Sequence, residues 1–392
     1  MWYRVVQPYT ARSATTQPYT TLNSAKRYYT TLHNPKQREA LLHNPTQRKA
    51  LLHNTMKGLV IKSTGTSYGV HFEDGTTAEC HVKGNFRIRG IRSTNPIAIG
   101  DHVEVTQLED GTNWITELYN RKNYIVRRST NLSYASHILA ANVDMAALIV
   151  TLRYPETSTT FIDRFLATCE AYRVPACLIF NKIDLLNEEE LQALADLRQL
   201  YESLGYPTYA ISAKDMAENG AEWFNKTILH HTTQPYTTLH NPTPHYTTLL
   251  SGNSGVGKST LLNAILGKDI ARTGAISSAH HKGMHTTTFS EMYPLNNSTQ
   301  PYTTLDNPTP SSWIIDTPGI KGFGLLDVEK EEVGHYFREI FEVARDCRYS
   351  NCLHTGEPGC AVYQAVVDGK IALSRYESYL SILDDTNEGK YR

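Results

Sequence analysis

The stretch "SGNSGVGKST" at residues 251–260 fits the pattern G-x-x-x-x-G-K-[S/T], in which glycines let backbone N–H groups close around phosphates. Lys258 is then placed to reach the β- and γ-phosphate oxygens, and the Ser259 hydroxyl to bind Mg²⁺. The next residues, "TLLNAIL", predict a helix whose N-terminus faces the anion. The sequence therefore predicts a phosphate-binding loop made of Gly252, Asn253, Ser254, Gly255, Val256, Gly257, Lys258, Ser259 and Thr260.

The strand expected before this loop is short. Only "TTLL" (247–250) separates the loop from repeated, turn-rich text, so a chance glycine-rich turn is the alternative interpretation. Two further stretches support the phosphate loop. "WIIDTPG" (313–319) predicts a short strand that ends in Asp316, which is placed to hold the Mg²⁺ shell, with the Gly319 N–H placed to sense a γ-phosphate. "HTTT" (285–288) lies between these motifs and offers the Thr287 hydroxyl as a second metal-seeking group.

The tetrapeptide "NKID" (181–184) follows the apolar run "ACLIF" and predicts a base-reading loop. The Asp184 carboxylate can accept hydrogen bonds from the N1–H and the exocyclic amine of guanine, which adenine does not offer. A site built on such pairing can reject the wrong base by about 10⁴-fold or more. Asn181 and Lys182 are expected to brace the loop and cover the base. "SAK", made of Ser212, Ala213 and Lys214, follows the strand "TYAI" and suits a backbone contact to the base oxygen.

The order of these motifs is reversed relative to most nucleotide-binding domains that contain both. Residues 123–335 alternate apolar strands with amphipathic helices, which predicts an α/β sheet, and each motif ends a predicted strand. Each motif alone fits an ordinary strand-end loop, whereas together they indicate a guanine nucleotide. We infer a circularly permuted GTPase domain, in which the segment after "DTPG" leads directly into the C-terminal region. Motion of that segment with the bound nucleotide is hypothesised to reach the tail.

Residues 56–122 precede this domain and read as a small closed barrel. Short alternating segments broken by Gly and Asp-Gly turns predict about five antiparallel strands, which fit an OB-fold. "KGNFRIRGIR" (83–92) combines basic side chains with an aromatic ring, which suits RNA phosphates and a stacked base. The alternative is a solvated barrel loop. The candidate RNA-binding residues are Lys83, Phe86, Arg87, Arg89 and Arg92.

The C-terminal region, 336–392, contains "CRYSNCLHTGEPGC" (347–360). Cys347, Cys352, His354 and Cys360 supply three thiolates and an imidazole, a set that suits tetrahedral Zn²⁺ and leaves no open position for catalysis. We therefore expect one structural zinc ion. Cys80, Cys169 and Cys177 stand apart and are expected to be small buried residues.

Composition sets outer bounds on the function. The chain has 392 residues, 40% hydrophobic and 20% charged, with a formal net charge of −1, which fits a globular protein with two or three cores. Any binding of nucleic acid must then come from local patches. No run of eighteen apolar residues and no secretory signal is found, so we expect no membrane association and a cytoplasmic location.

Repeated text interrupts this organisation. "QPYT" occurs at 7–10 and 17–20, and longer copies read "QPYTTLHNPTP" at 234–244 and "QPYTTLDNPTP" at 300–310. Their irregular spacing and lack of an apolar face argue against a solenoid. We interpret residues 1–55 as a disordered low-complexity leader, and the segments near 232–246 and 298–311 as insertions into the GTPase domain.

Barrel, permuted GTPase and Cys₃His tail, in that order, resemble the small-ribosomal-subunit-dependent GTPase A (RsgA, or YjeQ) family. The resemblance covers about 56–392 and rests on "NKID", "SAK", "SGNSGVGKST", "GMHTTT", "DTPGIKGFG" and the cysteine cluster. It implies a bacterial assembly factor that binds the nearly mature small ribosomal subunit and leaves after GTP hydrolysis. It also implies contacts from the barrel and the zinc region to ribosomal RNA, and we expect a monomer. Ile320 follows "DTPG" where many GTPases carry a water-orienting Gln, so His285 is the candidate for that role beside Lys258, Thr287 and Gly319.

Two other functions remain open on the sequence alone. One is an RNA-binding adaptor whose GTPase domain is inactive or only gates binding, although Lys258, Ser259 and Asp316 are all intact and argue for chemistry. The other is a general ATPase, which Asp184 opposes.

Overall fold

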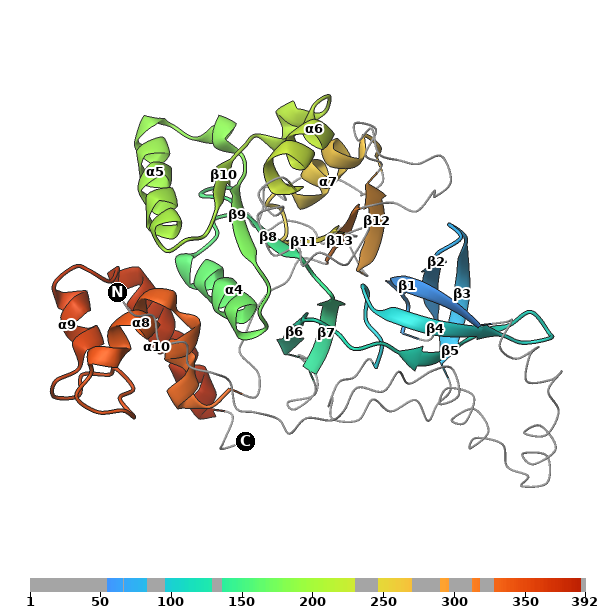
Figure 1. The fold of residues 1–392 in the computed structure, drawn as a ribbon. Helices are drawn as coiled ribbons and strands as arrows, with labels where there is room; N and C mark the ends of the chain where they lie inside the picture. Colours follow the sequence, from blue (N-terminus) through green and yellow to red (C-terminus); the bar gives the residue numbers. More distant parts are fainter. Residues whose placement is uncertain are drawn as a thin grey trace, which may run out of the picture.

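The computed structural model describes residues 55–65, 67–82, 96–128, 136–229, 246–269, 290–295, 312–317 and 328–388. Figure 1, whose helix and strand labels are used below, shows a barrel at one end, an α/β sheet in the middle and a helical C-terminal region against the far side. Of the helices in the described ranges, none has both the length and the apolar character needed to cross a bilayer.

Five strands close into a barrel in the N-terminal region. They are β1 (Thr55–Ser63), β2 (Tyr68–Phe72), β3 (Thr77–Val82), β4 (His102–Gln107) and β5 (Asn113–Leu118). β1 pairs with both β2 and β4, and β3 pairs in parallel with β5, which closes the order β1-β2-β3-β5-β4. Alternate side chains fill the interior, among them Val60, Val70, Val103, Val105 and Ile115. The predicted OB-fold barrel is confirmed, and its Asp-Gly turns place Gly75 and Gly111 at φ of 84° and 82°.

A polar contact links the barrel region to the chain that follows it, because the Asn142 side-chain amide donates to the Gly100 carbonyl at 2.8 Å. A buried ion pair within the barrel region lies next to it in the sequence. The Arg121 guanidinium donates to both carboxylate oxygens of Asp101, each at 2.6 Å, and the Arg121 side chain is only 6% exposed. Immediately after this joint, β6 (Tyr124–Arg128) and β7 (Ser136–Ala141) form a separate antiparallel pair.

The central sheet has the order β10-β9-β8-β11-β13-β12. Its strands are β8 (Met145–Val150), β9 (Ala176–Phe180), β10 (Thr208–Ala210), β11 (Tyr246–Gly252), β12 (Glu291–Leu295) and β13 (Ser312–Asp316). Neighbouring strands are parallel except for β12 and β13, which are antiparallel. The strands that come first in the chain, β8 to β10, thus lie beside β11 and β13, which come later. This arrangement agrees with the predicted permuted α/β fold.

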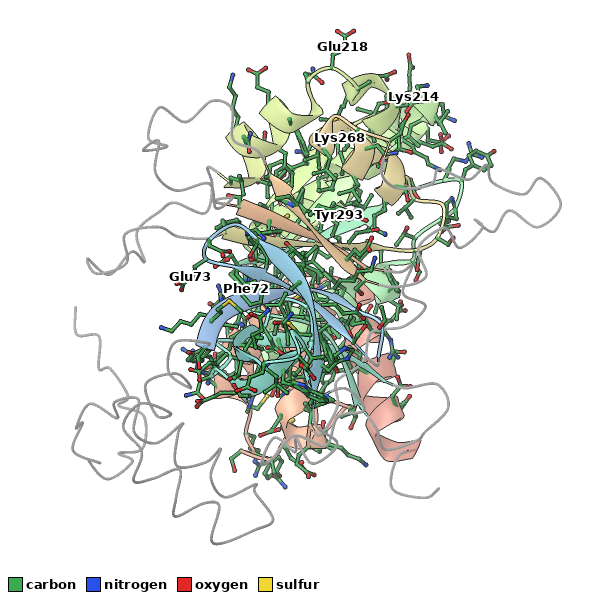
Figure 2. The ribbon with its side chains drawn as sticks, turned by 90° about the vertical axis from the view of Figure 1, so that its right-hand side faces the viewer. Phe72, Glu73, Lys214, Glu218, Lys268 and Tyr293 are labelled. Carbon is green, nitrogen blue, oxygen red and sulfur yellow. The ribbon has the colours of Figure 1, made fainter. Side chains whose placement is uncertain are left out.

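The barrel and the sheet meet along β1 and β12. Lys62 pairs with Glu291 in register and as an ion pair, so the described strands from β10 to β4 form one eleven-stranded sheet. The His71 and Trp313 rings also meet edge to face at 5.2 Å. A cavity of about 360 Å³ lies at this junction, and Phe72 and Glu73, labelled in Figure 2, form part of its lining.

Helices cover both faces of the sheet because successive strand residues point to opposite sides. Leu148, Leu249 and Ile315 face the helices α4 (Thr159–Ala171) and α5 (Glu188–Ser203). Ile149, Leu250 and Ile314 face α6 (Gly220–Phe224) and α7 (Lys258–Leu266). Short 3-10 turns span Ile183–Leu185 and Ala213–Met216, and a π-turn spans Asn225–Leu229. Cys169 and Cys177 lie in this core and Cys80 in the barrel, which confirms that they are buried.

The C-terminal region is a cluster of short helices. It contains α8 (Arg338–Val343), α9 (Ala361–Val367) and α10 (Leu373–Glu388), with 3-10 turns at Lys330–Tyr336 and Ala344–Asp346. Val333, Phe337 and Tyr379 form its core together with Ala167 of α4, so this region packs against the helix that covers the sheet. Figure 1 shows α10 beside α4.

A buried arginine fixes this contact. Arg375 of α10 is 1% exposed and donates to Asp163 of α4 at 2.7 Å and to Glu339 of α8 at 2.6 Å. The Tyr201 hydroxyl of α5 donates to the same Asp163 oxygen at 2.8 Å. The guanidinium also lies 4.7 Å from the centre of the Phe337 ring. Four helices of two regions therefore share one polar cluster.

The repeats did not prevent the central strands from forming. β11 begins at Tyr246, has seven residues and is buried over six of them, so the concern about a weakened strand before the phosphate loop is corrected. Tyr246 and Leu295 both lie opposite Ser312, so the chain enters β11, leaves β12 and enters β13 at the same edge of the sheet. The leader and the two insertions lie outside the described residues, apart from Thr55 and Tyr246.

Candidate functional site

The phosphate loop connects β11 to α7, as its sequence pattern predicts. Gly257 has a φ of 92°, and a Cβ placed there would lie 2.3 Å from the Asn181 side-chain nitrogen. Gly252 also packs against the neighbouring strand, since a Cβ placed there would lie 2.6 Å from the Ile149 carbonyl oxygen. The glycines are therefore required by close packing as well as by backbone conformation.

The base loop is tied to the phosphate loop through side chains. Asn181, at 4% exposure, donates to the Val256 carbonyl at 2.8 Å and accepts from the Ala213 N–H at 2.9 Å. Lys182 donates to the Gly255 carbonyl at 2.6 Å. Partial burial lowers the pKa of Lys182, which Asp184 partly offsets. The structure thus places all three predicted loops at the carboxyl edge of the sheet, where α/β folds bind ligands.

Asp184 lies on the turn after β9 and faces the residues that follow β10. Its carboxylate accepts from the Ser212 hydroxyl at 2.9 Å and from the Lys214 ammonium at 2.5 Å. The hydrogen bond from Lys214 lowers the pKa of Asp184, and the Ser212 bond acts in the same direction. The carboxylate is therefore held as an anion, the form that can accept two donors from a base edge.

Lys258 and Asp316 meet at the phosphate end of the sheet. Asp316 ends β13 beside Leu250 of β11, and the Lys258 ammonium forms an ion pair with it. Their side chains are 7% and 2% exposed. Thr317 donates its hydroxyl to the Leu250 carbonyl at 2.9 Å, which fixes the backbone just past Asp316.

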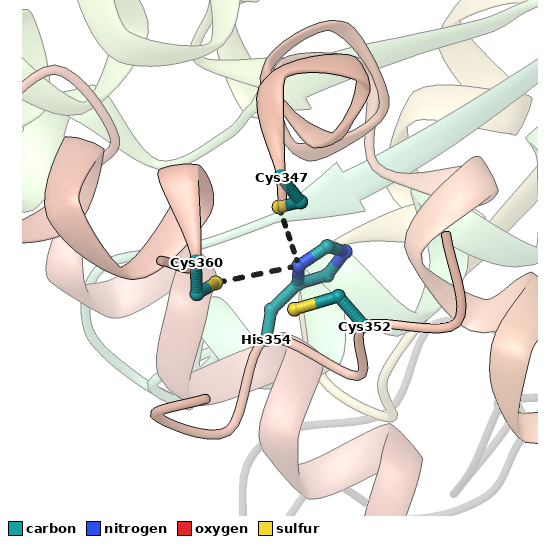
Figure 3. Close-up of side chains that lie close together, drawn as sticks. All are labelled: Cys347, Cys352, His354 and Cys360. Atoms are coloured by element: carbon teal, nitrogen blue, oxygen red, sulfur yellow. Dashed lines mark hydrogen bonds between the residues drawn. The ribbon is translucent and has the colours of Figure 1, made fainter. Parts of the chain in front are cut away.

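The C-terminal cluster brings its four predicted residues together (Figure 3). The ligand atoms of Cys347, Cys352, His354 and Cys360 all lie within 4.8 Å of one another. His354 Nδ1 is 3.5 Å from the Cys347 Sγ and 3.6 Å from the Cys360 Sγ. Three sulfurs and one imidazole nitrogen at this spacing could hold a metal ion, and the donor set is the one that zinc prefers.

The scaffold around this cluster holds the loop in place. The Tyr376 hydroxyl donates to the His354 carbonyl at 2.5 Å, and the Tyr379 hydroxyl to the Leu353 carbonyl at 2.6 Å. The Glu357 carboxylate accepts from the N–H groups of Leu353 and Thr355. Both tyrosines belong to α10, so the cluster and the Arg375 contact are carried by the same helix.

Several predicted residues lie outside the described ranges. These are His285, Thr287 and Gly319 of the candidate catalytic group, and Lys83, Phe86, Arg87, Arg89 and Arg92 of the candidate RNA-binding stretch.

Comparisons with known proteins agree with this geometry. The RsgA GTPase model matches residues 118–326, and the RsgA N-terminal domain model matches residues 57–115. "Small ribosomal subunit biogenesis GTPase RsgA" of Phocaeicola vulgatus is 55% identical over 86% of this chain and 99% of its own length. A Bacteroides thetaiotaomicron protein, named as RsgA 2, is 53% identical with the same coverage.

The chain belongs to the RsgA GTPase family. Solved structures agree: YjeQ from Thermotoga maritima is 30% identical with a TM-score of 0.59, and it covers 86% of this chain and 99% of its own. YloQ, titled a circularly permuted GTPase, is 26% identical with a TM-score of 0.58, covering 87% and 98%.

Membership in the RsgA GTPase family makes the chain a GTP hydrolase and confirms its permuted fold. The family also implies Mg²⁺ with GTP. The Ser259 hydroxyl and the Asp316 carboxylate fit that ion because Mg²⁺ prefers hard oxygen ligands.

Two contributions near the site were not predicted from the sequence. The Tyr154 carbonyl accepts from the Lys182 ammonium, and Tyr154 has a φ of 51°, which is uncommon for a bulky residue. Thr317 anchors the end of β13 through its buried hydroxyl. The sequence "RYP" after an apolar strand could have indicated the role of Tyr154. Thr317 lies within "WIIDTPG", which was interpreted only for Asp316 and Gly319.

Proposed function

We propose that this chain binds the small ribosomal subunit and hydrolyses GTP to GDP during late subunit maturation, with hydrolysis linked to its release. One observation carries the proposal. The phosphate loop, Asp184 and Asp316 converge at one sheet edge in a chain that is 55% identical to a protein named as a small ribosomal subunit biogenesis GTPase. In this proposal the protein acts in the cytoplasm as a monomer.

The proposed nucleotide contacts follow from the site geometry. Residues 252–260 cradle the phosphates through backbone N–H groups, with the start of α7 behind them. Asp184 accepts from the guanine edge, and Lys182 covers the base. Asn181 contributes indirectly, because its two hydrogen bonds hold the phosphate loop and the Ala213 N–H at a fixed separation.

The proposed chemistry is positioning and charge stabilisation. Lys258 leaves Asp316 and donates to the β- and γ-phosphate oxygens. Ser259, Thr287 and Asp316 would hold Mg²⁺, which would neutralise charge on those oxygens. The Gly319 N–H contacts the γ-phosphate, and His285 orients the attacking water. Because Ile320 stands where a water-orienting Gln is common, we expect slow turnover that the subunit accelerates.

The regions on either side of the GTPase region supply binding and stability in this proposal. A structural zinc ion at Cys347, Cys352, His354 and Cys360 stabilises the C-terminal fold. The barrel stretch 83–92 contacts ribosomal RNA phosphates. The proposal keeps the boundaries expected from the sequence, which are leader 1–55, barrel 56–122, GTPase region 123–335 and zinc region 336–392.

The test is GTP hydrolysis by the purified full chain, alone, with small ribosomal subunits and with large ribosomal subunits. We expect a low basal rate that small subunits raise many-fold and large subunits do not. The Asp184→Asn variant is the matched control, since it should lose turnover of GTP in all three conditions. Absence of turnover in all three conditions would contradict the proposal and favour an RNA-binding adaptor. Equal stimulation by large subunits would contradict the proposal that the small subunit is the specific partner.

A further inference from the structure

Lys214 forms an ion pair with the Asp184 carboxylate, which is the group proposed above to bind guanine. Its ammonium lies 2.5 Å from Oδ2 of Asp184, while the Ser212 hydroxyl lies 2.9 Å from Oδ1. The Asp184 side chain is 18% exposed and that of Lys214 is 61% exposed. The pair therefore lies at the mouth of the site, where the lysine can swing away into solvent.

Two kinds of donor then compete for one carboxylate. Guanine offers an N1–H and an exocyclic amine, one donor for each oxygen of Asp184. A hydroxyl such as that of Ser212 uses a single lone pair, so it can remain on Oδ1 beside a base donor. An ammonium in a charge-assisted bond is harder to share, because its positive charge would face the exocyclic amine. We therefore expect guanine at Oδ2 to weaken or displace the Lys214 bond.

We propose that Lys214 tunes base specificity by competing with the exocyclic amine of guanine for Asp184. The proposal rests on the base-reading role of Asp184 in the proposed function. Hypoxanthine, the base of inosine nucleotides, carries N1–H but no exocyclic amine, so it can bind Oδ1 and leave the Lys214 ion pair intact. Lys214 thus penalises guanine more than hypoxanthine and reduces the discrimination between them.

The decisive variant is Lys214→Met, which keeps the length of the stem and removes the donor. Lys268→Met is the matched control, because it removes the same charge from an exposed lysine at the end of α7 (both lysines are labelled in Figure 2). The measurement is the equilibrium dissociation constant of GDP and of IDP for the full chain, at low and at high salt.

We expect Lys214→Met to bind GDP about two- to fivefold more tightly, the range for an exposed ion pair, and IDP with little change. The ratio of IDP to GDP dissociation constants should rise by the same factor. Salt screens exposed charges, so raising the ionic strength should increase this ratio in the parent protein and not in Lys214→Met. Lys268→Met should leave the ratio at its parent value.

Other outcomes overturn the proposal. If Lys214→Met weakens GDP and IDP by the same factor, the lysine packs on the base instead of competing with it. An unchanged ratio shows that Lys214 has no role in discrimination.

The Asp184→Asn variant separates these failures from a failure of base reading. An asparagine amide donates to the O2 carbonyl of xanthine, so this variant should prefer XDP to GDP. If it does and the Lys214→Met ratio is unchanged, only the lysine proposal fails. If Asp184→Asn still prefers GDP to XDP, Asp184 does not read the base, and both proposals fail.

Discussion

Lys258 and Asp316 form an ion pair that is almost excluded from water. Burying two charges is costly, and their mutual attraction compensates only while both are present. Binding of Mg²⁺ and nucleotide, as proposed, would exchange this pair for two others: lysine with phosphate and aspartate with the metal shell. The phosphate loop is thus held together by the same two residues that later contact its ligand.

Replacing Lys258 with methionine tests this dual role. The variant leaves Asp316 buried without the lysine charge, so the free energy of unfolding should fall by about 3–5 kcal/mol. GTP turnover should fall by about 10²–10³-fold or more, because a donor to the developing charge is lost. Denaturant unfolding without nucleotide and steady-state hydrolysis are the two measurements.

The double variant Lys258→Met/Asp316→Asn provides the control for this prediction. It removes both charges, so it should recover most of the lost stability while remaining inactive. If the single variant is as stable as the parent protein, the ion pair does not stabilise the loop.

At the scale of single residues, the motifs located the candidate site residues. They did not predict which side chains form ion pairs with one another. The pattern G-x-x-x-x-G-K-[S/T] located Lys258, and "NKID" located Asp184. Neither showed that Lys258 bonds to Asp316 or that Lys214 bonds to Asp184. Such choices depend on side-chain rotamers in the folded site, which are set by packing and not by spacing along the chain.

Among the secondary-structure elements, α10 carries the strongest link between the C-terminal region and the sheet. Its Arg375 is shared between Asp163 of α4 and Glu339 of α8. Arg338 adds a second contact, with its guanidinium 4.1 Å from the centre of the Tyr206 ring. These contacts favour a C-terminal region that moves together with α4. The hypothesis that nucleotide-dependent motion after "DTPG" reaches the tail stays a prediction.

Arg375→Met should therefore destabilise both regions together. Removing the arginine leaves the buried Asp163 and the partly buried Glu339 without this cation, so we expect a loss of about 3–5 kcal/mol in the free energy of unfolding. Arg345→Met is the matched control, because this exposed arginine lies over the exposed Phe341 ring, and it should change stability by less than about 0.5 kcal/mol. Equal effects of the two variants in denaturant unfolding would refute the role of Arg375.

Metal removal tests the cysteine cluster. We expect one zinc ion per chain by elemental analysis, and Cys352→Ser should release it. Because structural zinc supplies folding free energy, a strong chelator should lower the thermal transition of the C-terminal region. Cys80 lies in the barrel, so the control variant Cys80→Ser should keep the metal. Full zinc content in Cys352→Ser would remove that residue from the ligand set.

Strands and helices were largely predictable because apolar runs and caps mark them. "ACLIF" became β9 over its full length, and α5 ends shortly before Gly205, which adopts a φ of 80°. β11 was the exception, since its "YTTLL" uses the letters of the repeats. Local sequence could not tell a repeat in an insertion from one in a strand, whereas pairing with β8 and β13 on both sides decides it.

At the scale of the whole molecule, the position of the repeats relative to the nucleotide site determines whether they affect it. The insertions attach at Tyr246, Leu295 and Ser312, at the sheet edge where β11 and β13 begin. The proposed nucleotide contacts lie at the other ends of these strands, at Gly252 and Asp316.

Excising the two repeats should therefore leave the site intact. Removing residues 234–244 and 298–310 leaves Asn296, Asn297 and Ser311 to join β12 to β13, a loop length common in hairpins. We expect the GDP dissociation constant and basal turnover to stay within about twofold of the parent values, since surface changes away from a site are usually small. A tenfold loss of GDP affinity would show that the repeats support the site.

The order of the central strands also has a consequence for how the chain is made. β8 pairs with β9 and with β11, but Val150 and Tyr246 lie 96 positions apart in the sequence. At about 5–20 residues per second, a translating ribosome exposes β8 for roughly 5–20 s before β11 emerges. During that interval β8, a strand made only of apolar residues, has an open edge. We therefore expect the unpaired edge of β8 to need protection from aggregation while the rest of the chain is being translated.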